Sequence, residues 1–231
     1  MTLLFFQGLA DTAKKVNDLV DGTGEKKIKI FDLLANGGPL MIPLALLLLL
    51  AIFFFAERVI AIKKASKIEG NFMNIIRDHI VTGNVSAARS LAKNTDNAVA
   101  RMIDKGLQRI GKPIDAIEKS MESVAMLEMY KMERNMAILS SIAKMAPLFG
   151  FLGTIFGMIQ LFSDINNSGK FDLNTIAGGI YVKMVTSATG LIIGILAYVA
   201  HNYLSVQIDK TANRMEVSSA DFLDILQEPT R

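Results

Sequence analysis

The residues with the clearest chemical potential form one polar stripe in an otherwise apolar stretch of the chain. Their steps of three or four place them on one helix face: Lys183, Thr186, Ser187, Gly190 and Gly194. Polar groups within hydrocarbon need a hydrogen-bonding partner or a path for water. A lysine and two hydroxyls on one face therefore favour contact with an ion or with a polar group of another helix.

A second apolar stretch, Met145 to Phe162, carries a matching stripe of small residues. Its members at helical spacing are Gly150, Gly153, Thr154 and Gly157. Lipid gains nothing from such a stripe, whereas another helix can approach it closely. Thr154 lies ten residues before Asp164 and Ser187 thirteen after Asn174. At ~1.5 Å per residue, we expect both hydroxyls roughly 15 to 20 Å below the same membrane surface.

Two interpretations of these polar residues stay open. Thr154 and Ser187 either line a cavity or bond back to a carbonyl of their own helix and merely permit close packing. Lys183 either extends toward the nearer membrane surface or pairs with an acidic group inside the cavity. A lysine at the bilayer centre costs ~3 kcal/mol even on lenient insertion scales, so it needs one of these outlets.

Carboxylates are missing from the interiors of the apolar stretches. The nearest one, Glu57, lies beside Arg58 at the edge of the first stretch. A proton relay needs a group that changes charge, and a hydroxyl does not ionise at ordinary pH. If protons cross this protein, another chain must supply the titrating group.

Other kinds of chemistry find no support in the sequence. The chain has 0 cysteines, which excludes disulfides, thiolate catalysis and cysteine metal sites. His79 and His201 stand alone, and Gly178 and Gly179 lack the context of a nucleotide loop. Basic residues do not cluster among aromatic ones, as a nucleic-acid surface requires. We expect no enzyme, no metal, no cofactor and no nucleic-acid partner.

The apolar residues are too clumped for a soluble domain, although 231 residues would suffice for one. No charge occurs between Gly37 and Ala56, and ~20 residues cover the ~30 Å hydrocarbon core. We expect an all-α membrane protein with three transmembrane helices, two of them extended into a cytoplasmic helical bundle. The expected segments are an amphipathic interfacial or partly ordered tail at 1–36, a first span at 37–57, a cytoplasmic helical domain at 58–140, a second span at 141–163, a link at 164–175, a third span at 176–203 and a C-terminal helix at 204–231.

Two further expectations concern continuity and orientation. No proline or glycine occurs between Pro113 and Pro147, so one helix is expected from Pro113 to Phe162. Basic residues cluster directly after the first span, at Arg58, Lys63, Lys64 and Lys67. The positive-inside rule then places the N-terminus outside and the tail inside, although Lys26, Lys27 and Lys29 argue the other way.

These stripes resemble a known family. The stretch IAKMAPLFGFLGTIFGMI, Ile142 to Ile159, is similar to the second-span signature of the ExbB/TolQ/MotA proton-channel family. The stretch Ile176 to Leu204 resembles the third-span signature. Thr154 matches the second-span threonine, and Ser187 occupies the place of the third-span threonine. Many ExbB proteins have a glutamate where this chain has Val182, with Lys183 beside it.

The resemblance implies an assembly and a role. It implies a homopentameric ring in the bacterial inner membrane around an ExbD- or TolR-like single-span subunit, whose intramembrane aspartate carries the proton. Thr154, Ser187, Thr186 and Lys183 are then expected to line the ion pathway, with Gly150, Gly153, Gly157, Gly190 and Gly194 packing at the ring interior. Glu57 and Arg58 would mark the cytoplasmic edge of the first span.

The expected function is that of an ExbB-like motor subunit that uses the proton-motive force to energise a TonB-like protein for transport across the outer membrane. A fourth span typical of MotA-like stators is missing, which favours the ExbB-like and TolQ-like interpretations. The alternatives are a TolQ-like subunit for envelope maintenance and a membrane scaffold that conducts nothing.

Overall fold

The computed structural model describes residues 40–67, 70–169 and 173–227, and every regular element in these ranges is a helix. The expected amphipathic segment 1–36 and link residues 170–172 lie outside the described residues. The helices follow one another as α3 (Met41–Ser66), α4 (Phe72–Val81), α5 (Val85–Asn94), α6 (Ala98–Leu107), α7 (Ile114–Glu133), α8 (Met136–Ser168) and α9 (Leu173–Gln227).

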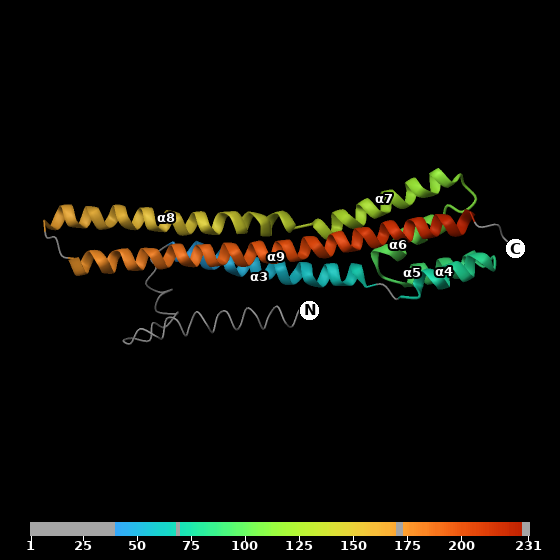
Figure 1. The fold of residues 1–231 in the computed structure, drawn as a ribbon, viewed down its shortest axis with the longest axis horizontal. Helices are drawn as coiled ribbons and strands as arrows, with labels where there is room; N and C mark the ends of the chain where they lie inside the picture. The colour runs from blue at the N-terminus through green and yellow to red at the C-terminus, as the bar shows by residue number, and fades with distance from the viewer. Residues whose placement is uncertain (1–39, 68–69, 170–172, 228–231) are drawn as a thin grey trace.

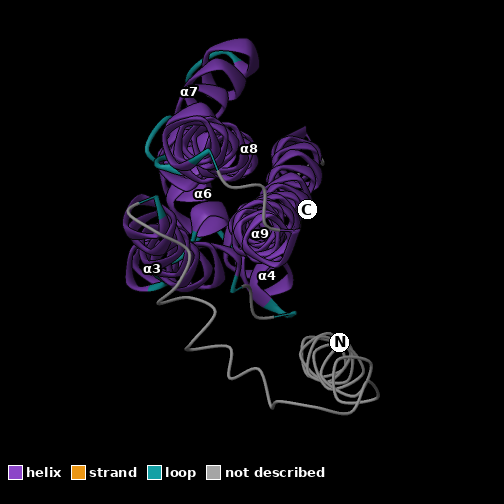
Figure 2. Cartoon of the chain, turned by 90° about the vertical axis from the view of Figure 1, so that its left-hand side faces the viewer, coloured by secondary structure: helices purple, strands orange, loops and turns teal. Residues whose placement is uncertain are grey.

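The long helices give the chain an extended shape. In Figure 1, α8 and α9 run antiparallel side by side, and α3 lies against the middle of α9. Figure 2, which looks along this long axis, shows α3, α8 and α9 end-on, at the three corners of a triangle. The short helices α4 to α6 gather with α7 around the C-terminal part of α9, which we call the end bundle.

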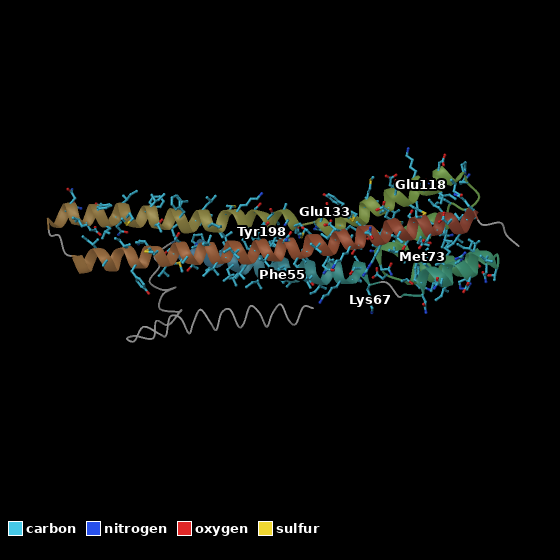
Figure 3. All side chains as sticks on the ribbon, in the orientation of Figure 1. Phe55, Lys67, Met73, Glu118, Glu133 and Tyr198 are labelled. Atoms are coloured by element: carbon cyan, nitrogen blue, oxygen red, sulfur yellow. The ribbon has the colours of Figure 1, made fainter. Side chains whose placement is uncertain are left out.

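Three helical segments, in α3, in α7 with α8, and in α9, are long and apolar enough to cross a membrane. Little of their apolar surface is covered by the chain itself: Ile42 of α3 is 74% exposed, Phe151 of α8 is 60% exposed and Leu191 of α9 is 53% exposed. Figure 3 shows side chains projecting outward along these helices. Because such a surface is unfavourable in water, lipid or other protein chains must cover it.

One long helix from Pro113 to Phe162 was expected, and this prediction is wrong at a single point. Helix α7 ends at Glu133, α8 begins at Met136, and Asn135 between them has a left-handed backbone with φ 64°. Asparagine is among the few non-glycine residues that adopt this conformation at modest cost. The third apolar stretch and the tail do form one unbroken helix, the 55-residue α9.

The end bundle is organised around α6, the most buried of the short helices. Gly106 of α6 lies so close to its neighbours that a Cβ atom there would be 2.6 Å from both Met121 Sδ and Phe222 Cε1. Asn97 caps α6 by accepting a hydrogen bond from Ala100 N and also donates to the carbonyl of Lys67. The end of α3 is thereby tied to the start of α6.

Candidate functional site: the α8–α9 seam

Glycines bring α8 and α9 into backbone contact along a line that we call the seam. A Cβ atom at Gly190 would lie 2.6 Å from the carbonyl oxygen of Ala146 and 2.8 Å from Gly150 Cα. A Cβ atom at Gly153 would lie 2.7 Å from the methyl carbon of Thr186. Small residues let membrane helices approach this closely, so dispersion and backbone contacts hold the pair together.

A proline lies in the seam at its end nearest the end bundle. Pro147 lies inside α8, where a missing N–H leaves the carbonyl of Ala143 without its usual helical donor. Gly194 of α9 faces this point, since a Cβ atom there would lie 2.5 Å from Pro147 Cγ and 3.0 Å from the Ala143 oxygen. The five predicted glycines therefore pack helices together, and the helices that they join belong to one chain.

Helix α3 covers one edge of the seam. Leu44 of α3 is fully buried and packs with Ala146 of α8 and Ile193 of α9. Leu40, just before α3, lies near Gly153, with 3.8 Å between its Cδ1 and the Cβ position of that glycine. Thr186, 1% exposed, faces Gly153 with its methyl group and so lies toward this covered edge. The structure does not bring Thr186 to the other edge of the seam.

Thr154 and Ser187 lie on that other edge, which we call the open edge. Thr154 directly follows Gly153, and Ser187 directly follows Thr186, the two residues that are in contact on the covered side. Because each residue turns a helix by about 100°, the next side chain in each helix points away from α3. Both side chains are partly exposed within the chain. The contacts of Gly150 with the backbone of Ser187 confirm that the two hydroxyls lie within about one helical turn of the same level.

The hydroxyl of Thr154 is already used as a donor. Its Oγ1 donates to the carbonyl of Phe151 at 2.7 Å, as the back-bonding interpretation predicts. A hydroxyl has one hydrogen and two acceptor lone pairs, so Thr154 still offers an acceptor at the open edge. Such an oxygen suits a cation or the O–H of a protonated carboxylic acid better than an anion.

Lys183 lies one turn along α9 from Ser187, within the seam. Its Cγ, Cδ and Cε atoms fill the space that a side chain at Gly157 would otherwise take. The lysine stem is thus held between the helices, and the residue as a whole is partly exposed. Val182 next to it has a side chain that lies outside the described residues.

Glu57 and Arg58 form a polar clasp at the other end of α3. Arg58, only 5% exposed, pairs with Glu57 Oε1 at 2.6 Å and donates to the carbonyl of Lys131 at 3.1 Å. Asn135 Nδ2 donates to Glu57 Oε2 at 3.2 Å. The clasp therefore joins α3 to the break between α7 and α8, near the labelled Glu133 in Figure 3.

An ion-pair network that sequence reasoning missed continues from this clasp into the end bundle. Glu128, whose side chain is 4% exposed, pairs with Arg101 at 2.6 Å and Lys131 at 2.7 Å. Arg101 also pairs with Asp96 at 2.6 Å, and Asp96 pairs with Lys64 of α3 at 2.8 Å. The sequence does carry a signal for Glu128: it is an acidic residue at helical spacing from Ile117 and Met121, on the apolar face of α7, where a buried charge needs a partner.

The network shifts the pKa values of its members. Burial raises the pKa of Glu128, but hydrogen bonds from Arg101 and Lys131 outweigh it, so the net pKa is lowered. The hydrogen bond from Lys64 lowers the pKa of Asp96, and the hydrogen bond to Glu128 raises the pKa of Arg101. All three groups are therefore held in their charged forms. Among the residues that the structure describes, no group of three or more histidine or acidic side chains could hold a metal ion.

Several known proteins are similar to this chain in sequence. The chain is 23% identical over 189 residues to a putative biopolymer transport protein ExbB homolog of Methanothermobacter thermautotrophicus, covering 81% of this chain and 67% of that protein. It is 28% identical over 180 residues to a putative biopolymer transport protein ExbB-like 1 of Synechocystis, covering 76% and 70%. It is also 28% identical over 97 residues to the Tol-Pal system protein TolQ of Haemophilus influenzae, covering 42% and 41%.

A family model extends over the seam and over the part of the network that follows α3. The model of the MotA/TolQ/ExbB proton channel family matches residues 94–217, more than half of the chain, which includes Asp96, Thr154 and Ser187. The three apolar helices, the glycine seam and these matches agree: this chain is a membrane protein that belongs to the MotA/TolQ/ExbB proton channel family, and it is ExbB-like.

Proposed function

We propose that this chain is the ring subunit of an ion-driven motor in the bacterial inner membrane. In this proposal an ExbD-like subunit with one span and an intramembrane aspartate contacts the ring, and the assembly energises a TonB-like protein for transport across the outer membrane. The observation that carries the proposal is the pairing of Thr154 and Ser187 at one level of the open edge.

The chemistry of the open edge supports a titrating partner. The apolar helices bring hydroxyls but no interior carboxylate to this level, so the group that changes charge comes from elsewhere. Thr154 accepts but no longer donates, which favours the protonated form of a partner carboxyl beside it. A carboxyl that is protonated there and ionised elsewhere would couple proton passage to movement of the partner helix.

The exposed apolar faces of α3, α8 and α9 support a homo-oligomeric ring. Lipid covers part of these faces, and neighbouring copies cover the rest, with the open edge of each seam turned inward. The pentameric number follows from the family resemblance alone. In this arrangement the glycines stiffen each wall of the ring, while Thr154 and Ser187 of every copy face its interior.

The orientation follows from charge. The clasp and the ion-pair network concentrate lysine and arginine at one end of α3, which favours a cytoplasmic end bundle and a periplasmic N-terminus. Each proton that crosses 100 mV supplies ~2.3 kcal/mol, so a demanding mechanical step needs several protons. A TolQ-like role in envelope maintenance is supported by the Haemophilus influenzae match and uses the same open edge.

Substitution of Thr154 by valine tests the proposal, because it removes the acceptor and keeps the shape. The ring should still assemble, while uptake driven by the proton-motive force falls at least tenfold. Thr189→Val is the matched control: Thr189 also bonds back to its own helix, at Val185 O, but it lies toward the covered side. Full activity of Thr154→Val with a normal ring would refute the ion-pathway role and favour a scaffold.

A further inference from the structure

Lys183 is a charge in an apolar segment without an acidic partner in the described part of the chain. No ion pair joins it to any described carboxylate, and its stem is fixed in the space beside Gly157. A stem held between two helices does not sweep the lipid surface as a free lysine would. Its ammonium group is consequently available to an anion that approaches along the seam.

In the described part of the chain, few other charged or titratable groups lie near Lys183. On α8, Asp164 lies seven residues beyond Gly157 toward the link and is exposed, and Lys144 lies thirteen residues in the other direction. On α9, Tyr181 is exposed. The described charges of α3 begin only at Glu57, at the far end of its apolar stretch. Among the residues that the structure describes, Lys183 is thus the full charge nearest to the hydroxyl pair along these helices.

We propose that Lys183 is an anion-binding residue of the ring. It lies one helical turn from Ser187, and its ammonium group pairs with the ionised carboxylate of the inserted partner helix. This inference rests on the proposed function and extends it. The acceptor oxygen of Thr154 suits the protonated carboxyl, whereas the ammonium group of Lys183 suits the ionised one. Thr154 lies three residues from Gly157, beside which the Lys183 stem lies, so two positions ~4.5 Å apart along the seam would then hold the two protonation states of one partner group.

The held stem favours this partner over a lipid phosphate. A lysine that anchors a helix at the membrane surface usually lies on its lipid-facing side, where Tyr181 and Met184 project. Lys183 lies instead on the stripe that faces α8. Since an opposite charge within about 4 to 6 Å favours the ionised form of a carboxyl group, the lysine should lower the pKa of the partner carboxylate.

The test uses the full chain copurified with its single-span partner in membranes. Dicyclohexylcarbodiimide reacts with a protonated intramembrane carboxyl, so the pH at which labelling of the partner falls to half reports its apparent pKa. Lys183→Met keeps an apolar stem for the space beside Gly157 and removes the charge. We expect this variant to raise the labelling midpoint by at least one pH unit, a tenfold change in the protonation equilibrium.

Two further variants make the result specific. Lys183→Arg should keep the wild-type midpoint, and Lys144→Met, which removes the exposed lysine in the apolar part of α8, should also leave it unchanged. An unchanged labelling midpoint in Lys183→Met overturns the inference. If that variant also loses a bound anionic lipid, detected by mass measurement of the complex, the anion that Lys183 binds is a lipid phosphate and the inference is equally overturned. If no single-span partner copurifies or none is labelled, the proposed function itself fails.

Discussion

Gly190 offers the sharpest test of the seam. Gly190→Ala would place a Cβ atom 2.6 Å from the oxygen of Ala146 and 2.8 Å from Gly150 Cα, and both obstacles are backbone atoms. Ordinary contacts are about 3.5 Å or longer, so α8 and α9 would have to separate by about 1 Å. Overpacking of this kind costs about 1–3 kcal/mol.

Gly178→Ala is the matched control for this substitution. Gly178 lies on the same helix, and a Cβ atom there meets nothing within 4 Å. Both changes gain up to ~1 kcal/mol from the helix propensity of alanine. The difference between the two variants therefore isolates the packing cost, about 1–3 kcal/mol.

The assay is the thermal unfolding midpoint of the purified protein in one detergent. Gly190→Ala should unfold several degrees below Gly178→Ala, and Gly178→Ala should equal or exceed the unsubstituted chain. Equal midpoints for the two alanine variants would show that the helices do not touch at Gly190.

Since the chain has 0 cysteines, Thr154→Cys and Ser187→Cys can be introduced together to test by cross-linking whether these two positions lie close together.

Two other substitutions address the end bundle and the helix break. The pKa of Glu128 is lowered on folding, so its contribution to stability is complete above the unfolded value of about 4.3 and disappears as the pH falls through the folded value. The free energy of unfolding of the unsubstituted protein should fall between pH 6 and pH 3, and in Glu128→Gln this fall should be smaller by about 1–3 kcal/mol. A pH profile of the unfolding midpoint that is the same in both proteins would contradict the network. Asn135→Ala should destabilise by about 1–2 kcal/mol because of the left-handed backbone, whereas Asn135→Gly should lose less; equal denaturation midpoints would argue against that conformation.

Several features were predictable because they depend on local periodicity. The runs of apolar residues predict the membrane-crossing helices, and steps of three or four predict that Gly150 and Gly157 lie on one face of their helix. The equal depth of Thr154 and Ser187 follows from counting residues to a short link. These inferences need only the constant rise and turn of a helix.

Other features depended on contacts between distant segments. The helix break at Asn135 escaped prediction, because asparagine is tolerated in helices as well as in left-handed turns. Glu128 was missed as a network residue, since its partner Arg101 belongs to another helix, 27 residues away, and the network continues through Asp96 to Lys64 of α3. Likewise, Thr186 and Ser187 are neighbours of similar chemistry, and only the position of α3 distinguishes the covered residue from the one on the open edge.

The amino-acid sequence by itself determined that this protein has helices for a membrane and hydroxyls rather than carboxylates within them. Tertiary structure decided that the glycines join α8 to α9 of one chain, that Lys183 is held beside Gly157, and that Thr154 and Ser187 share an edge. The physical reason is that helical periodicity reports which residues share a face. What that face touches depends on packing between segments far apart in the chain.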